Sequence, residues 1–291
     1  MESASIDTSV RKIKAPAKLN LRLKITGRRK DGYHELSSIM VPISLFDRLE
    51  LHVVSRGIAL QCEGIAIPTD ETNLVYQAAQ AFLARAEIKN GVAVKLVKKI
   101  PVAAGMGGGS SDAAATLLAL NRIWPRALPA GELHRIALDL GADVPFFLEC
   151  KPALASGIGE ILKPLTEWPS YWYVVVNPGL EVSTAWVYGQ LSLALTRGGR
   201  EDINKLLKGR HFGISRVLAN DLEAVTAERY PIIGTIKGHL MDAGAEGAMM
   251  TGSGPTVFGV FLTQEAAERA TQHLISRRVG DVFLTTNWQR P

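Results

Sequence analysis

The hydrophobic pattern of the first half of the chain predicts strands and helices in alternation. Strands are predicted at residues 13–25, 36–43, 48–54 and 92–98, where apolar residues are dense or occupy every second position. Helices are predicted at residues 72–86, 110–121 and 130–140, where apolar residues recur with helical spacing. The last of these helices meets Gly141, a residue typical of helix C-caps. The first half therefore has the pattern of a mixed α+β domain.

The second half has a pattern of its own. It opens with YWYVVVN at residues 171–177, a run that favours a strand and is closed by Pro178 and Gly179. Further strands are predicted at residues 247–250, 257–262 and 282–286, and helices at residues 235–243 and 264–276. With the helical segments in between taken as insertions, the order is β-α-β-β-α-β, which is ferredoxin-like. We place the domain boundary near residue 163, giving domains 1–163 and 164–291, although the last strand can also pair with the first domain.

The composition is that of a globular protein with a sizeable core. Of the 291 residues, 47% are hydrophobic and 21% are charged, and no apolar run approaches the roughly 18 residues of a membrane span. Cys62 and Cys150 lie far apart without metal-ligand spacing, so we expect reduced thiols and a cytoplasmic location. The net charge of +5 comes without a recognisable nucleic-acid-binding module, so it favours a small polyanionic substrate such as a nucleotide.

The sequence PVAAGMGGGSSDAA at residues 101–114 concentrates glycine directly before a predicted helix. It is not a Walker A loop, because no lysine follows Gly109, and not a Rossmann turn, because Ser110 replaces the third glycine. The physics of both motifs still applies, since a glycine loop and a helix N-terminus together offer backbone N–H groups to a phosphate. Ser110, Ser111 and Asp112 can equally be N-cap residues, so the segment alone leaves a phosphate site and a structural use both open.

Further motifs accompany this segment. They are PAKLN at residues 16–20, DGYHEL at residues 31–36, GADVPFF at residues 141–147 and MTGSGP at residues 250–255. Together with the central P-x-x-x-G-x-G-G-G-S-S, this combination resembles the GHMP small-molecule kinases over nearly the whole chain. The resemblance implies an N-terminal domain like that of ribosomal protein S5 and a ferredoxin-like C-terminal domain. It also implies ATP-dependent phosphorylation of an alcohol, and DGYHEL and GADVPFF narrow the acceptor to a cytidine-diphosphate-linked polyol of non-mevalonate isoprenoid synthesis.

The resemblance also assigns roles to individual residues. It places the ATP triphosphate along the backbone of residues 102–112, which are Val102, Ala103, Ala104, Gly105, Met106, Gly107, Gly108, Gly109, Ser110, Ser111 and Asp112. It implies that Asn20 binds the polyol, that Tyr33 and His34 bind the cytosine, and that Tyr188 closes on the cytosine from the other side. The chain departs from the family in three positions, with alanine at Ala103 and Ala104 where glycine is frequent and Met106 in place of leucine.

Lys18 and Asp143 are the candidate catalytic residues. Phosphoryl transfer to an alcohol needs a carboxylate within hydrogen-bond reach of the hydroxyl. Asp143 follows the end of a predicted helix, where an acid is electrostatically unfavourable, so a plain structural role is disfavoured. Lys18 lies in a predicted strand and shares a face with Asn20 by the period of two. An ammonium there can orient Asp143 or balance the transferred charge.

Some assignments remain open at this point. A kinase needs Mg²⁺ to bridge phosphates, and either Ser110 or Ser111 can be a ligand. The glycines around Ser253 indicate a tight turn that lies near the site or is only a hairpin turn. For the function, a different GHMP kinase acting on homoserine, mevalonate or a sugar is the main alternative. A non-catalytic nucleotide- or nucleic-acid-binding module is the second.

Overall fold

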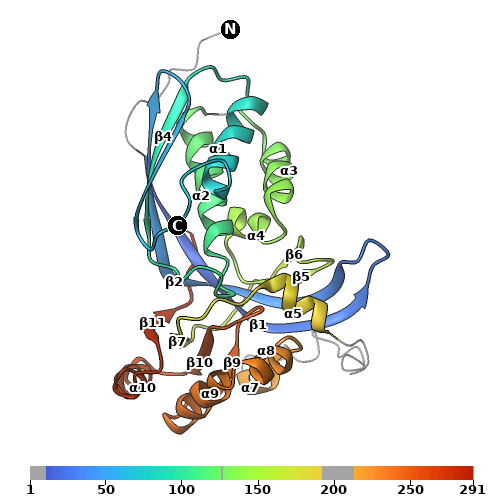
Figure 1. The fold of residues 1–291 in the computed structure, drawn as a ribbon, viewed down its shortest axis with the longest axis vertical. Helices are drawn as coiled ribbons and strands as arrows, with labels where there is room; N and C mark the ends of the chain where they lie inside the picture. Colours follow the sequence, from blue (N-terminus) through green and yellow to red (C-terminus); the bar gives the residue numbers. More distant parts are fainter. Residues whose placement is uncertain (1–10, 126, 192–212, 291) are drawn as a thin grey trace.

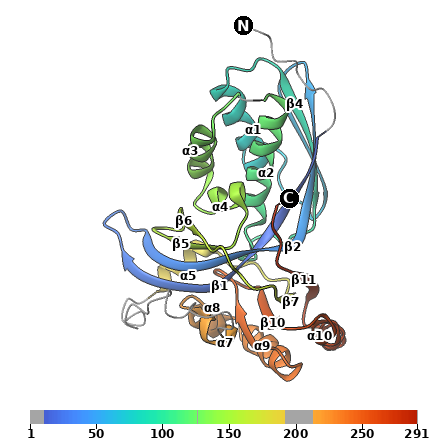
Figure 2. The same cartoon turned by 180° about the vertical axis from the view of Figure 1, so that it is seen from behind.

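The computed structural model describes residues 11–125, 127–191 and 213–290 of the chain. Two β-sheets meet in the middle of the molecule, and each carries helices on the face turned away from the other sheet (Figures 1 and 2). The α+β fold class predicted from the sequence is therefore confirmed.

Among the residues that the structure describes, the first sheet has seven strands. Its main path runs in the order β3 (Ile58–Gly64), β4 (Gly91–Lys98), β2 (His34–Val54), β1 (Arg11–Arg28) and β8 (Ala219–Asn220), and β5 (Ala153–Ser156) and β6 (Ile161–Pro164) extend it from another part of β2. The region predicted as two strands, 36–43 and 48–54, is the single strand β2. The interruption between them is a bulge, because Pro16 pairs with Phe46 while Ala17 pairs with Ile43.

Four helices cover the face of this sheet that is opposite the second sheet (Figure 1). They are α1 (Leu74–Arg85), α2 (Gly108–Ile123), α3 (Ala130–Leu140) and α4 (Val144–Glu149). Asn73 caps α1, since its side-chain oxygen accepts the N–H of Val75 at 2.8 Å. The apolar run after Asp143 forms the short helix α4, which has Pro145 in its first turn, where proline is tolerated.

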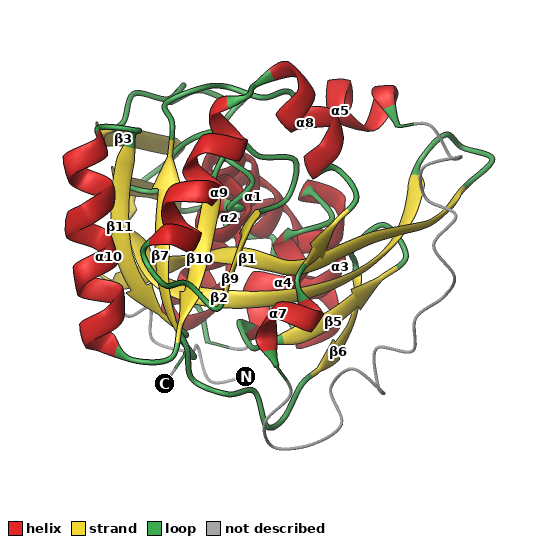
Figure 3. Ribbon diagram, turned by 90° about the horizontal axis from the view of Figure 1, so that it is seen from below, coloured by secondary structure: helices red, strands yellow, loops and turns green. Residues whose placement is uncertain are grey.

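Within the described parts of the chain, the second sheet has four strands, in the order β11 (Asp281–Thr286), β7 (Trp172–Asn177), β10 (Val257–Phe261) and β9 (Gly247–Met250). Helices α9 (Ile232–Asp242) and α10 (Gln264–Arg277) lie over one face (Figure 3). The shorter helices α5 (Thr184–Gln190), α7 (Ile214–Val217) and α8 (Glu223–Arg229) come between β7 and α9. The ferredoxin-like order is confirmed, and the last strand belongs to this second sheet because it pairs with β7.

Burial on both faces explains the unbroken apolar sequence of β7. Tyr173 and Val175 pack towards β1 of the first sheet, whereas Val174 and Val176 pack against the helices of the second. A strand that is buried on both faces needs no polar alternation. One face of β7 therefore packs in the cluster between the two sheets, and its other face packs in a separate cluster beneath the helices of the second sheet.

The chain also crosses between the halves at two further points. The strand β8 lies within residues 164–291 but pairs in parallel with β1 of the first sheet. After β11, Asn287 bridges to Ile43 and the N–H of Trp288 donates to the carbonyl of Pro42 at 2.9 Å. The division near residue 163 thus stays a prediction. Within the described ranges, no helix combines the length and the apolar character that a membrane crossing requires.

Candidate active site

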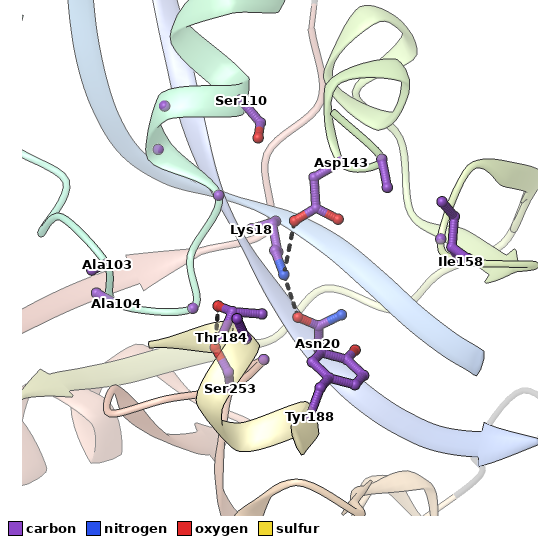
Figure 4. Close-up of a pocket in the computed structure, with 18 of the residues that line it drawn as sticks. Lys18, Asn20, Ala103, Ala104, Ser110, Asp143, Ile158, Thr184, Tyr188 and Ser253 are labelled. Carbon is purple, nitrogen blue, oxygen red and sulfur yellow. Dashed lines mark hydrogen bonds and ion pairs between the residues drawn. The ribbon is translucent and has the colours of Figure 1, made fainter. Parts of the chain in front are cut away.

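A cavity of about 1040 Å³ lies where the two sheets meet. Its walls come from segments that are far apart in the chain (Figure 4). They are the middle of β1, the tip of the β1–β2 hairpin, residues 101–112 (the glycine segment), the residues before α4, the helix α5 and the turn between β9 and β10. Every motif singled out in the sequence therefore contributes residues to the wall of this one cavity.

Lys18 and Asp143 meet in this cavity. Lys18 extends from β1 on the face opposite the core residues Ala17 and Leu19, and its Nζ is 3.4 Å from Asp143 Oδ2 (Figure 4). The ammonium is buried, but the Asp143 side chain is 36% exposed at the N-cap of α4, without a capping hydrogen bond. The carboxylate thus keeps free acceptor positions that face the cavity.

Asn20 is the second partner of Lys18. The Lys18 ammonium donates to Asn20 Oδ1, and Asn20 Nδ2 donates to Ser38 Oγ at 2.8 Å. Ser38 Oγ in turn donates to the carbonyl of Arg22 at 2.6 Å. Because this chain of hydrogen bonds uses both ends of the Asn20 amide, it fixes the orientation of the side chain and, through it, of the ammonium.

The glycine segment leads into α2 in a conformation that requires glycine. Gly107 is the N-cap with φ of 69°. A Cβ on Gly105, which has φ of 74°, would lie 2.2 Å from the carbonyl oxygen of Thr251. The first intrahelical hydrogen bond runs from Ser111 N–H to the carbonyl of Gly107 at 2.9 Å. The preceding N–H groups of α2 have no acceptor inside the helix, so they can bind an anion such as a phosphate.

The residues of the glycine segment differ in whether they line the cavity. Val102, Ala103, Ala104, Gly105, Gly107, Gly108, Gly109, Ser110 and Asp112 line the cavity, whereas Met106 and Ser111 do not. Met106 is buried in the core, and its carbonyl accepts the N–H of Lys18 at 3.0 Å. Ser111 Oγ is buried without a hydrogen-bond partner, while the Ser110 side chain points into the cavity (Figure 4). Ala103 has φ of 50°, a conformation in which glycine is favoured.

Asp112 belongs to a sealed ionic cluster at the start of α2. The ammonium of Lys98 pairs with Asp47 and lies 3.0 Å from Asp112 Oδ2. Asp47 Oδ1 also accepts the N–H groups of Lys99 and Ile100, at 2.5 and 2.9 Å. Burial raises the pKa of Asp112, the charge of Lys98 opposes this, and the charge of Asp47 adds to it. Burial lowers the pKa of Lys98, but the two carboxylates outweigh it and the net shift is upward.

The other end of the cavity is aromatic. The rings of His34 and Tyr188 lie 5.4 Å apart with a tilt of 34°. Burial, together with the charge of Arg28, lowers the pKa of His34. Burial raises the pKa of Tyr188 to about 12, and the charge of Asp143 adds to the effect. Tyr33 also lines the cavity but is 62% exposed at the hairpin tip, so the structure brings His34 and Tyr188 together and leaves Tyr33 apart.

Comparison with known proteins bears directly on this site. Two family models match the chain, GHMP kinases N terminal domain over residues 73–151 and GHMP kinases C terminal over residues 193–279. The 4-diphosphocytidyl-2-C-methyl-D-erythritol kinase of Syntrophotalea carbinolica is 48% identical over 264 residues, which span 90% of this chain and 94% of the relative. The chain belongs to this family of GHMP kinases.

Two further comparisons place the GHMP kinase among its neighbours. The relative from Geobacter metallireducens, of the same name, is 46% identical and spans 90% of this chain and 93% of its own length. A crystal structure of a 4-(cytidine 5'-diphospho)-2C-methyl-D-erythritol kinase matches with a TM-score of 0.84 at 38% identity, covering 96% of this chain and 100% of that one. A homoserine kinase from Cytophaga hutchinsonii, with a TM-score of 0.79 but 20% identity, shares the fold.

Membership of the family confirms the enzyme class. This GHMP kinase is an ATP-dependent kinase of small molecules, as the four sequence motifs predicted. The alternative of a non-catalytic nucleotide- or nucleic-acid-binding module is therefore excluded.

Sequence reasoning assigned no role to Thr184, Gly159 or Thr251 in this GHMP kinase site, and it left open whether Ser253 lies near the site. Ser253 Oγ lies 2.8 Å from Thr184 Oγ1, and both residues line the cavity (Figure 4). A Cβ on Gly159 would come within 4.0 Å of Asp143 Oδ1, so this glycine forms the wall beside the carboxylate. Thr251 Oγ1 accepts a hydrogen bond from the N–H of Asn20. Thr251 and Ser253 stand in the sequence TGSGPT between β9 and β10, and a hairpin turn explains that composition equally well.

Proposed function

We propose that this GHMP kinase transfers the γ-phosphoryl group of ATP to the 2-hydroxyl of 4-diphosphocytidyl-2-C-methyl-D-erythritol, a step of isoprenoid precursor synthesis. One observation carries the proposal: the His34–Tyr188 pair lies in the same cavity as Lys18 and Asp143. An aromatic face and a neutral imidazole suit a pyrimidine base, which offers a π-face and hydrogen-bonding edges. The names of the relatives, which are 43–48% identical, support the same acceptor.

The reaction follows from the arrangement of the polar groups. Asp143 accepts the proton of the acceptor hydroxyl, and the hydroxyl oxygen forms a bond to the γ-phosphorus. The bond from the γ-phosphorus to the β–γ bridging oxygen breaks, and ADP leaves with that oxygen. Lys18, held between Asp143 and Asn20, stabilises the negative charge that is transferred. The N–H groups at the start of α2 hold the triphosphate in place.

Magnesium is part of the proposal. Among the residues that the structure describes, no group of three or more His, Cys, Asp or Glu side chains could hold a metal ion. This fits Mg²⁺, which usually takes one or two protein oxygens together with substrate phosphates and water. We assign the Ser110 hydroxyl as the protein ligand, because it points into the cavity beside the start of α2. The Ser110 hydroxyl would hold the ion, and Mg²⁺ would supply positive charge that offsets part of the charge of the phosphates.

The acceptor is tested by measuring ADP release with a panel of alcohols. We expect turnover with the cytidine-diphosphate-linked polyol and little with mevalonate, homoserine or galactose, because these lack a base for His34 and Tyr188. Phosphorus NMR of the product should show one new phosphomonoester. Comparable efficiency with any of the other three alcohols would contradict the proposed acceptor. We also propose a cytoplasmic location, in keeping with the free thiols of Cys62 and Cys150.

A further inference from the structure

The strand that carries Lys18 and Asn20 has two edges. One edge pairs with β2 along its whole length. At the other edge, the N–H of Lys18 donates to the carbonyl of Met106 in the glycine segment at 3.0 Å. Further along, residues Arg22 and Leu23 pair with β8. Between these two, the N–H of Asn20 donates to a side chain, Thr251 Oγ1, at 2.9 Å.

Thr251 links the acceptor side of the cavity to the nucleotide side. It is fully buried at the end of β9, and its hydroxyl uses both its donor and its acceptor capacity. It accepts from Asn20 and donates to the carbonyl of Gly105, with the oxygen atoms 3.4 Å apart. Asn20 is the residue that orients Lys18, and Gly105 lies at the bend of the glycine segment. A single hydroxyl therefore contacts both groups of residues.

The backbone around Thr251 leaves little freedom for independent movement. Asn220 Nδ2 donates to the carbonyls of Met250 and Gly252, at 2.8 Å each, and clamps the turn on both sides of Thr251. Gly105 lies so close to the Thr251 carbonyl that no Cβ fits between them. Because packed contacts of this kind do not deform gradually, a shift of the glycine segment displaces Thr251 and with it the N–H of Asn20.

We propose that Thr251 is a positioning residue that couples nucleotide binding to acceptor binding. Nucleotide bound on the glycine segment fixes the position of Gly105. Through its hydroxyl, Thr251 then fixes the backbone N–H of Asn20, and the side-chain amide of Asn20 is held where the polyol binds. By linkage, the acceptor strengthens nucleotide binding by the same factor. The identity of the acceptor in this proposal rests on the function proposed above, whereas the link itself rests on the contacts of Thr251.

The test measures binding of the cytidine-diphosphate-linked polyol by calorimetry, with and without a non-hydrolysable ATP analogue. In the wild-type protein we expect the analogue to tighten acceptor binding by about 5-fold or more, the usual range for coupled sites. Thr251→Val keeps the shape of the side chain but loses the hydroxyl. In this variant the analogue should tighten acceptor binding by less than about 2-fold. Thr251→Ser should restore the wild-type factor, since serine retains the hydroxyl.

Thr256→Val is the matched control. Thr256 is also fully buried, lies next to the same turn, and accepts one hydrogen bond from Asn177 Nδ2 at 2.9 Å. Its valine variant should lose thermal stability like Thr251→Val but keep the wild-type coupling factor. If Thr251 contributed only to stability, Thr251→Val and Thr256→Val would change the coupling factor by the same amount.

The outcomes separate the two proposals. Equal acceptor affinity with and without the analogue in the wild type, or full coupling in Thr251→Val, overturns the link while leaving the proposed acceptor intact. No acceptor binding under either condition contradicts the proposed function and overturns the link with it. If Thr251→Val does not fold, amide exchange in the wild type decides. The ATP analogue alone must slow hydrogen exchange of the backbone N–H of Asn20, and an unchanged exchange rate overturns the proposal.

Discussion

Two lysine–aspartate clusters flank the glycine segment, and they differ in how open they are. Around Lys98, the lysine and both aspartates, Asp47 and Asp112, have at most 3% of their side-chain surface exposed. Around Lys18, the lysine is 5% exposed, but Asp143 is 36% exposed. The same residue types are thus sealed in one cluster and open in the other.

The difference shows how one pair of side-chain types serves two purposes. The sealed carboxylate of Asp47 is saturated by the Lys98 ammonium and two backbone N–H groups, which ties β2 to the end of β4 and the start of α2. Such a cluster fixes the position of the glycine segment, and Lys98 and Asp112 also border the cavity. Asp143 has one charged contact and free acceptor positions, so it remains available to a hydroxyl. We therefore expect mutations in the Lys98 cluster to lower stability, and mutation of Asp143 to lower activity.

The largest effect on activity is expected for Asp143→Asn. The amide cannot accept the hydroxyl proton, so kcat should fall by about 10²–10⁴-fold, the usual contribution of a general base. Binding of both substrates and the unfolding temperature should change little, because Asp143 makes no capping bond and is partly exposed. Steady-state kinetics and calorimetry measure these quantities. The control is Asp139→Asn, at an exposed position near the end of α3. Near-full turnover in Asp143→Asn would contradict the assignment of the base.

The largest effect on stability is expected for Lys98→Met. This change leaves two carboxylates buried without the ammonium that pairs with both, so the free energy of unfolding should fall by about 3–5 kcal/mol. Urea denaturation measures the loss. The matched control is Lys95→Met on the same strand, where the lysine pairs with Glu63 at the surface and should leave the unfolding midpoint essentially unchanged. Equal stability of the two variants would mean that the cluster does not hold the fold.

A smaller, pH-dependent effect is expected for Asp112→Asn. Because the pKa of Asp112 is raised in the folded protein above its ordinary value of 3.8, the folded state binds the proton more tightly than the unfolded state. Its contribution to stability is therefore present at low pH and is lost as the pH rises from about 4 through the raised pKa. The asparagine variant lacks this loss, so relative to wild type it should be more stable at pH 8 than at pH 5. Urea denaturation at both values tests this, and a pH-independent difference would contradict the direction.

Sequence periodicity predicted the elements that carry regular patterns. The helix α3 lies where helical spacing placed it, the strands β7, β9, β10 and β11 lie where short strand-favouring runs placed them, and the ferredoxin-like order followed from their succession. The face shared by Lys18 and Asn20 also followed from the period of two, because Ala17 and Leu19 had to be buried together. These features depend on neighbours along the chain, which is why a single sequence contains them.

Other features depend on contacts between distant residues. The edge strand β3 was missed although Ile58, Leu60 and Cys62 alternate with exposed positions, because the run is short and only Leu60 among them is buried. The two residues of β8 have no pattern of their own and are a strand only because β1 lies beside them. Likewise, nothing local marks Asp112 as a member of a sealed cluster, since its partners come from two other strands.

The pairing of β8 with β1 has a consequence for how the protein is made. Lys24 of β1 and Asp221, which follows β8, are joined by an ion pair although 197 positions separate them. A ribosome that adds about 5–20 residues per second therefore needs roughly 10–40 s to synthesise the partner of a strand that has already emerged. During this time the edge of β1 beyond Asn20 has no β8 to close it. The nascent first sheet thus has an open edge until β8 is made, and the cavity is complete only once the turn between β9 and β10 has also been made.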